Sequence, residues 1–181
     1  MTGSKRLLLA GLLLAALLPS LAAQNRWSRD DDGRQRTRPA VSIVGGIAHV
    51  AEGADGSAVT GGLRFDAPIG RFLIVEPGIT YFGYRSEAGG RIEYLLPEVS
   101  FQAQLPVGLV RPYGGAGIGF TEYLSGRGFT YVTLHLAGGV RILMGDWGLR
   151  GEARARSIDP FRQTTVDLTA GITRRFGGPR S

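Results

Sequence analysis

The stretch that decides the fold is Leu149-Arg150-Gly151-Glu152-Ala153-Arg154-Ala155-Arg156, in which every second residue is charged. Because successive side chains of a β-strand point to opposite faces, the charged residues share one face and the small or apolar residues share the other. A soluble sheet usually turns such charges to water and buries bulky residues beneath them, but the apolar face here is thin. The alternation therefore allows an inverted sheet, with charges inside a closed barrel and small apolar groups outside it.

Residues 1–23 are predicted to be a secretory signal peptide. Lys5 and Arg6 precede the apolar run Leu7–Leu18, and Pro19–Ala23 supplies the small residues of a cleavage site. This small-residue end disfavours an uncleaved anchor, and the apolar run falls short of the ~20 residues that a spanning helix needs. Since no later segment reaches that length, we expect the mature chain to be either a soluble exported protein or a barrel.

The composition excludes a disulfide scaffold and argues against nucleic acid as a partner. The 181 residues include no cysteine, so neither disulfides nor thiol chemistry are available. Glycine, with 29 residues, is about twice as frequent as its ordinary ~7%, which suits turns and closely packed strands better than helices. The formal net charge is +6, but every basic residue after Arg6 is an arginine, and these arginines alternate along strands instead of forming a basic patch.

Residues 40–176 are predicted to form one all-β domain between two shorter segments. Residues 24–39 carry many charges without periodicity and are expected to be a disordered polar leader; docking of Trp27 and the nearby arginines onto another component is the less favoured alternative. Residues 177–181 form a short C-terminal tail. From Ala40 onward, apolar and polar residues alternate between breaks rich in Gly, Pro and Asp. The predicted strands are Ala40–Val50, Ala58–Asp66, Arg71–Tyr84, Arg91–Gln104, Val110–Tyr123, Thr130–Met144, Trp147–Ser157 and Thr164–Phe176.

An even number of consecutive antiparallel strands closes naturally into an up-and-down barrel, but the alternation does not say which face lies inside. A soluble exported barrel that binds an apolar ligand would line its cavity with the apolar set, whereas a membrane barrel would line it with the charged set. Aromatic residues gather near both strand ends around an aliphatic middle, which favours a transmembrane β-barrel with two girdles. The predicted girdles are Phe65, Phe72, Tyr113, Trp147 and Phe176 at one end, and Tyr81, Phe82, Tyr84, Tyr94, Phe120, Tyr123, Phe129 and Tyr131 at the other.

Two segments resemble a known class. Arg111–Phe120 is similar to the Pro-Tyr-x-Gly-x-Gly-x-Gly strand of small bacterial outer-membrane β-barrel proteins, the OmpA/OmpX-like eight-stranded class. Leu168–Phe176 resembles the C-terminal insertion signal of that class, with Phe176 as its aromatic, although Gly177–Ser181 follow where the class usually ends. The resemblance implies a bacterial outer-membrane location and contact of the last strand with the barrel-insertion machinery. Outer-membrane lipids are the other expected partner, and we expect a monomer.

The resemblance also implies an interior filled by ion pairs, and the polar face supplies the residues. Arginine suits this role because its planar group bonds carboxylates in pairs and keeps its charge when desolvated. Glu76, Glu98 and Asp167 are the acids expected to meet the arginines of the opening stretch. With eight strands, a structural plug is favoured over a narrow pore. The expected network contains Arg64, Asp66, Glu76, Glu98, Arg111, Arg141, Arg150, Glu152, Arg154, Arg156, Asp167 and Arg175.

No catalytic, cofactor-binding or metal-binding residues are expected. The two histidines, His49 and His135, lack the His-x-Ser arrangement of the lipid A deacylase class. His135 could share the interior with Ser100 and Glu98 and superficially resemble a triad, but a histidine satisfied within the network is favoured. The expected outer loops, near Glu52–Ser57, Arg85–Gly90, Ser125–Gly128 and Ile158–Gln163, are short, which disfavours adhesion. A non-enzymatic outer-membrane barrel with a structural or interaction role is therefore predicted, with a lipid A-modifying enzyme or a narrow pore as alternatives.

Overall fold

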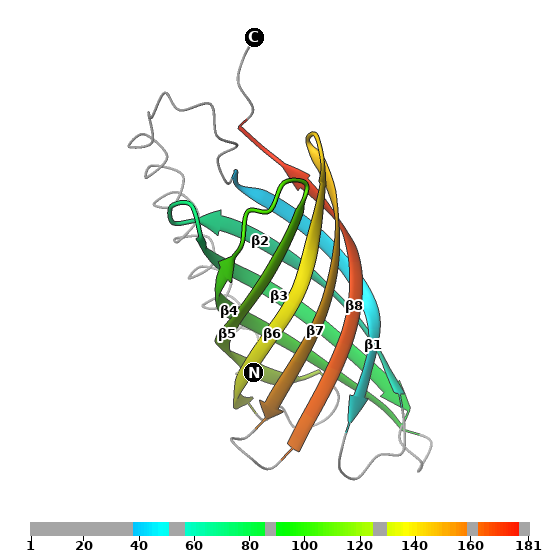
Figure 1. The fold of residues 1–181 in the computed structure, drawn as a ribbon. Helices are drawn as coiled ribbons and strands as arrows, with labels where there is room; N and C mark the ends of the chain where they lie inside the picture. Colours follow the sequence, from blue (N-terminus) through cyan, green and yellow to red (C-terminus); the bar gives the residue numbers. More distant parts are fainter. Residues whose placement is uncertain (1–37, 51–56, 86–89, 125–129, 159–162, 178–181) are drawn as a thin grey trace. The chain divides into compact units, whose positions relative to one another are not determined.

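The computed structural model describes residues 38–50, 57–85, 90–124, 130–158 and 163–177, and these form a closed antiparallel barrel (Figure 1). Each strand pairs with the next one along the chain, and β1 pairs with β8 to close the barrel. Within these ranges, no helix is long and apolar enough to cross a membrane. The strands are β1 Ala40–Val50, β2 Ser57–Pro68, β3 Leu73–Arg85, β4 Arg91–Gln104, β5 Val110–Tyr123, β6 Thr130–Met144, β7 Trp147–Ile158 and β8 Gln163–Arg175.

The predicted eight-stranded up-and-down barrel is confirmed, and four strands have the predicted bounds. The largest difference lies between β2 and β3, where Ala67 and Pro68 were expected in the turn. Both continue β2 and pair with Val75 and Ile74. A proline is tolerated at this strand end, where its missing N–H costs little of the ladder. The turn instead spans residues 69–72, with Gly70 at a φ of 98°.

The barrel has two unlike ends. At the end that carries Pro39 and Phe176, which we call the turn end, the connections are the short turns β2–β3, β4–β5 and β6–β7. At the opposite end, which we call the loop end, the connections contain residues 51–56, 86–89, 125–129 and 159–162, which lie outside the described ranges. The expected short outer loops fall mostly on these residues. The predicted signal peptide and nearly all of the predicted leader likewise lie outside the described ranges.

The charged face of the strands lies inside the barrel, and the apolar face lies outside. On β7, the inward-facing Arg154 and Arg156 are 1% exposed, whereas Leu149, on the other face of the same strand, is 46% exposed. The same alternation exposes large apolar residues on every strand, for example Ile43, Val59, Phe101, Leu136 and Leu168. Such a continuous apolar surface is unfavourable in water, but it is the surface that a barrel presents to the hydrocarbon of a bilayer. The barrel therefore spans a membrane, and the soluble ligand-binding barrel is ruled out.

The expected aromatic girdles are only partly correct. Phe72, Trp147 and Phe176 are exposed at the turn end, and Phe120 is exposed on β5. Tyr113 and Phe82, however, are buried inside the barrel because they share the inward face of their strands with Arg111 and Thr80. Phe101, which belonged to neither predicted girdle, is exposed on the outer face of β4. Phe129 and the side chain of Tyr84 lie outside the described part of the structure.

Candidate functional site

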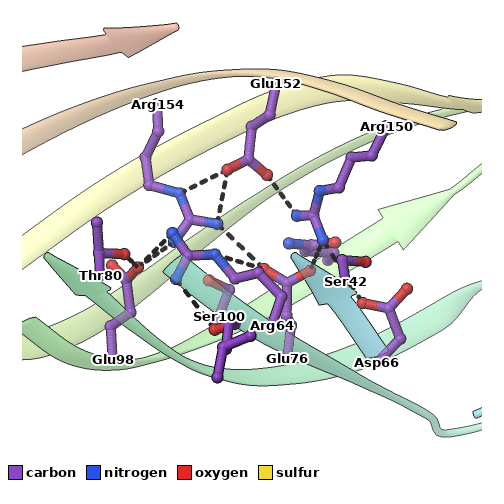
Figure 2. Close-up of polar contacts among 12 residues, drawn as sticks. Ser42, Arg64, Asp66, Glu76, Thr80, Glu98, Ser100, Arg150, Glu152 and Arg154 are labelled. Atoms are coloured by element: carbon purple, nitrogen blue, oxygen red, sulfur yellow. Dashed lines mark hydrogen bonds and ion pairs between the residues drawn. The ribbon is translucent and has the colours of Figure 1, made fainter. Parts of the chain in front are cut away.

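The barrel interior is the candidate functional site. Within the described ranges it contains six buried arginines and five buried carboxylates, which come from strands on all sides of the barrel. β7 contributes three of the arginines, and the carboxylates come from β2, β3, β4, β7 and β8. Figure 2 shows several of these side chains pointing toward one another across the interior. Their near balance of charge is what a narrow, water-poor interior requires, because isolated buried charges are very costly.

Glu76 is the centre of the network toward the turn end. Its carboxylate lies 2.5 Å from Arg150 Nη1, 3.2 Å from Arg141 Nη2 and 3.1 Å from Arg154 Nη2. Asp66 adds a second carboxylate, with its Oδ2 3.2 Å from Arg141 Nε. One buried glutamate on β3 thus contacts arginines of β6 and β7, which lie more than 60 residues later in the sequence.

Glu98 is the corresponding centre toward the loop end. It lies 2.9 Å from Arg64 Nη2, 2.7 Å from Arg154 Nη1 and 3.0 Å from Arg156 Nη2. The hydroxyl of Thr80 also donates a hydrogen bond to it, at 2.8 Å. Arg156 in turn contacts Asp167 on β8.

Arg154 joins the two centres. It contacts Glu76 and Glu98 and also lies 2.9 Å from Glu152 Oε1, so one guanidinium faces three carboxylates (Figure 2). The guanidinium spreads five N–H donors over a planar group and so reaches three separated carboxylates, whereas a lysine ammonium concentrates its three donors on a single atom. The network is therefore continuous along the interior.

Tyr113 belongs to the same network, which the sequence analysis missed. Its hydroxyl donates to Glu152 at 2.8 Å and accepts a hydrogen bond from Arg150 Nε at 2.9 Å. The guanidinium of Arg141 lies over its ring, 3.9 Å from the centroid, and donates to the Gln102 side chain at 2.6 Å. The signal was present in the sequence, because Tyr113 follows Arg111 by two residues and must share its face.

Two predicted members occupy the margin of the network. Arg111 is buried and pairs in register with Arg141, one strand position from the start of β5. Arg175 is half-buried at the turn end and donates to the Gly145 carbonyl at 3.1 Å. Close by, Arg38 forms an ion pair with Asp146 at 2.9 Å and donates to the carbonyl of Phe176 at 3.1 Å. Phe176, the predicted insertion signal, lies one residue beyond β8, and its N–H donates to Pro39.

Inward-facing glycines provide the space for these side chains. A Cβ at Gly78 would lie 2.8 Å from Arg64 Cδ, and a Cβ at Gly119 would lie 2.8 Å from Glu98 Cβ. At Gly117 it would collide with the His135 ring. The high glycine content thus has a specific cause, since eight strands enclose too little room for both a full inner layer of side chains and long arginines.

Ser100, His135 and Glu98 have the connectivity of a catalytic triad. Ser100 Oγ is hydrogen-bonded to His135 Nε2 at 2.7 Å, and His135 Nδ1 lies 3.4 Å from Glu98 Oε2. All three residues are buried, however, and Glu98 is already shared among three arginines. The sequence suggested this grouping, and the structure brings the three side chains together inside the barrel, where they are no more than 3% exposed.

An apolar and aromatic layer lies between the ion pairs and the loop end. Phe82, Leu96, Ala48 and Ala58 form a buried cluster, against which Tyr94 packs. Tyr123 packs edge-on against both Tyr94 and Tyr131, with ring centroids 4.4 Å and 5.9 Å apart. The interior therefore changes from a charged network to an apolar layer before the loop end is reached.

Comparisons with known proteins agree with this architecture. No protein-family model matches the sequence, and no curated protein matches it either. Among solved structures, Neisserial surface protein A is similar over 76% of this chain and 96% of its own, with a TM-score of 0.61 and 15% identity. Ail, the attachment invasion locus protein of Yersinia pestis, covers 78% of this chain and 100% of its own, with a TM-score of 0.57 and 15% identity.

The outer membrane enzyme PagL is also similar, over 75% of this chain and 99% of its own, with a TM-score of 0.54 and 16% identity. At such low identities the similarity concerns the fold. The similar structures include both an attachment invasion locus protein and an enzyme, so the fold alone does not indicate which activity this chain has. The chain has the eight-stranded antiparallel β-barrel fold of these small outer-membrane proteins, as its sequence predicted.

Proposed function

We propose that this protein is a non-enzymatic barrel of the bacterial outer membrane with a structural role or a role in binding other molecules. Its interior is permanently closed by the ion-pair network. The observation that carries the proposal is the contact of Arg154 with Glu76, Glu98 and Glu152 at once. Moving this guanidinium aside to open a path would leave three carboxylates without it. Such a loss costs ~3–5 kcal/mol for even one buried partner, so the closed interior is the stable one.

The surroundings follow from the two faces of the barrel. Outer-membrane lipids contact the apolar outer face, and the turn end, where β1 begins and β8 ends, faces the periplasm. The last strand and Phe176, whose N–H donates to the Pro39 carbonyl, form the segment that the insertion machinery binds. A monomer fits this arrangement, because pairing of β1 with β8 leaves no strand edge to which a second copy could add a strand.

A planar-bilayer recording tests the plug. The purified protein should insert without conductance steps, because the ion pairs and the Tyr94, Tyr123 and Tyr131 layer close the interior in series. A variant with Arg154→Ala and Tyr123→Ala, shown by heat-dependent gel migration to be folded, is the matched control and should conduct. Stable unit steps from the unaltered protein would contradict the plug and favour the narrow pore.

The lipid-modifying enzyme is a second candidate because of one observation, the hydrogen bond between Ser100 Oγ and His135 Nε2. Burial of both residues argues against it, since a lipid has no path to the hydroxyl in this closed interior. Treatment of the folded protein with a fluorophosphonate probe should leave Ser100 unlabelled, and cells that overproduce the protein should keep unchanged lipid A. Labelling that disappears in Ser100→Ala and in His135→Ala would instead establish a serine hydrolase.

A further inference from the structure

The β4–β5 turn differs in chemistry from the β6–β7 turn at the same end of the barrel. The sequence Leu105-Pro106-Val107-Gly108-Leu109 contains no charged or hydrogen-bonding side chain. Leu105, Val107 and Leu109 are 61%, 65% and 62% exposed. By contrast, the β6–β7 turn presents Asp146, which forms an ion pair with Arg38. Three bulky apolar side chains beyond the end of a strand pair are unfavourable in water and call for a covering partner.

This turn is continuous with the apolar outer face of the barrel. Phe101, on the outer face of β4, is exposed four residues before Leu105. The neighbouring β2–β3 turn is attached to it, because the Gln104 N–H donates to the Phe72 carbonyl at 2.7 Å, and Phe72 is itself exposed. Phe72, Leu105, Val107 and Leu109 therefore extend the lipid-facing surface past the end of β4; we call them the hairpin patch.

The backbone of the turn is also suited to an environment without water. The Leu105 N–H donates to Pro112 at 2.9 Å, the Val107 N–H donates to Leu105 at 3.0 Å, and the Leu109 carbonyl accepts from Leu143 at 2.8 Å. Pro106 has no N–H to desolvate. Gly108, with a φ of 61°, completes the reversal. Turns usually avoid lipid because their backbone groups need water, and these three hydrogen bonds reduce that cost.

We propose that the hairpin patch is inserted in the acyl-chain region of the leaflet at the turn end and anchors that side of the barrel beyond its strands. Membrane lipid is the occupant because the patch continues a surface that already faces lipid and carries no charge or polar group that would select a protein partner. Arg71 stands at its edge, with its guanidinium 5.1 Å from the Phe72 ring centroid, where it meets lipid phosphates as Phe72 enters the bilayer. This inference rests on the membrane location proposed above.

The absence of cysteine from the chain makes a direct test simple. Val107→Cys, Asp146→Cys and Leu168→Cys are each labelled with an environment-sensitive fluorophore and reconstituted into vesicles with or without brominated acyl chains. Leu168, exposed on the outer face of β8, reports the ordinary lipid contact, and Asp146 reports the polar turn at the same end. Folding of each labelled protein is checked by its heat-dependent gel migration.

The label at Val107 should be blue-shifted and quenched by brominated lipid at least half as strongly as the label at Leu168, while the label at Asp146 should be neither. Quenching at Leu168 but not at Val107 would overturn the inference and leave the membrane barrel intact. Absence of quenching at Leu168 would overturn the proposed function itself. A label at Val107 that is shielded only at high protein-to-lipid ratio would identify a second copy as the occupant, and that result also overturns the lipid anchor.

Discussion

Arg154 Nη1 lies 2.7 Å from Glu98 Oε1, and this ion pair links β7 to β4 through the centre of the barrel. The same guanidinium reaches Glu76 on β3 and Glu152 on its own strand. Because β4 and β7 are three strands apart in the closed barrel, the ion pair between Arg154 and Glu98 crosses the interior instead of joining two neighbouring strands. The stability of the barrel should depend on it more than on any ion pair at the surface.

Replacing Arg154 with alanine should lower the free energy of unfolding by ~3–5 kcal/mol, because it leaves buried carboxylates without a counter-charge. Urea titration in lipid vesicles, followed by Trp147 fluorescence in a Trp27→Phe background, measures the change. The matched control is Arg91→Ala, which removes an exposed pair with Glu93 at 2.8 Å and should change little. Equal effects of the two substitutions would contradict a central role for the buried network.

Replacing Tyr113 with phenylalanine should cost ~1–3 kcal/mol, because the hydroxyl that joins Arg150 to Glu152 is lost while the ring remains. The same urea titration measures it. Tyr81→Phe removes a hydroxyl that donates to Glu93 on the outer side, at 2.6 Å, and should cost less. An inert Tyr113→Phe variant would return Tyr113 to the lipid-facing girdle that its position near a strand end first indicated.

Two adjacent glycines on β5 should respond differently to alanine. A Cβ at Gly115 would collide with the Phe101 carbonyl and lie 2.8 Å from Gln102 Cα, whereas a Cβ at Gly114 would find its nearest atom 3.8 Å away. Gly115→Ala should therefore destabilise the barrel by ~1–3 kcal/mol, as overpacking does, and Gly114→Ala should be nearly neutral. The midpoint of heat-induced loss of the folded gel band compares them. The reverse order would mean that the assignment of inner and outer faces on β5 is wrong.

The strands and their faces could be predicted from sequence because both follow from a period of two broken by turn residues. Arg150, Glu152, Arg154 and Arg156 needed no structure to be placed on one face. The aromatic girdles failed where closeness to a strand end was given more weight than this same period, as at Tyr113 and Phe82. Applying the alternation to them would have placed both inside.

The ion-pair partners within the interior could not be predicted in this way. The two-residue period shows which face of a strand a side chain lies on, but not which side chain it meets across the barrel. Which carboxylate meets which arginine depends on the stagger of the strands and on where inward glycines leave room, as Gly78 does for Arg64. Glu76, Glu98 and Asp167 do contact the arginines of β7 in the structure. The division of these contacts into centres at Glu76 and Glu98, bridged by Arg154, could not have been derived from the alternation.

The most direct test of the account is spin-label scanning along the stretch Leu149–Arg156, one cysteine at a time, in lipid vesicles. Collision of the label with oxygen, which concentrates in hydrocarbon, is compared with collision with a water-soluble nickel complex. Oxygen collision should be greatest at Leu149, Gly151, Ala153 and Ala155, which face lipid, and access to both reagents should be low at the charged positions between them. Nickel access at Arg150, Arg154 and Arg156 would place the arginines in bulk water and contradict the inverted barrel.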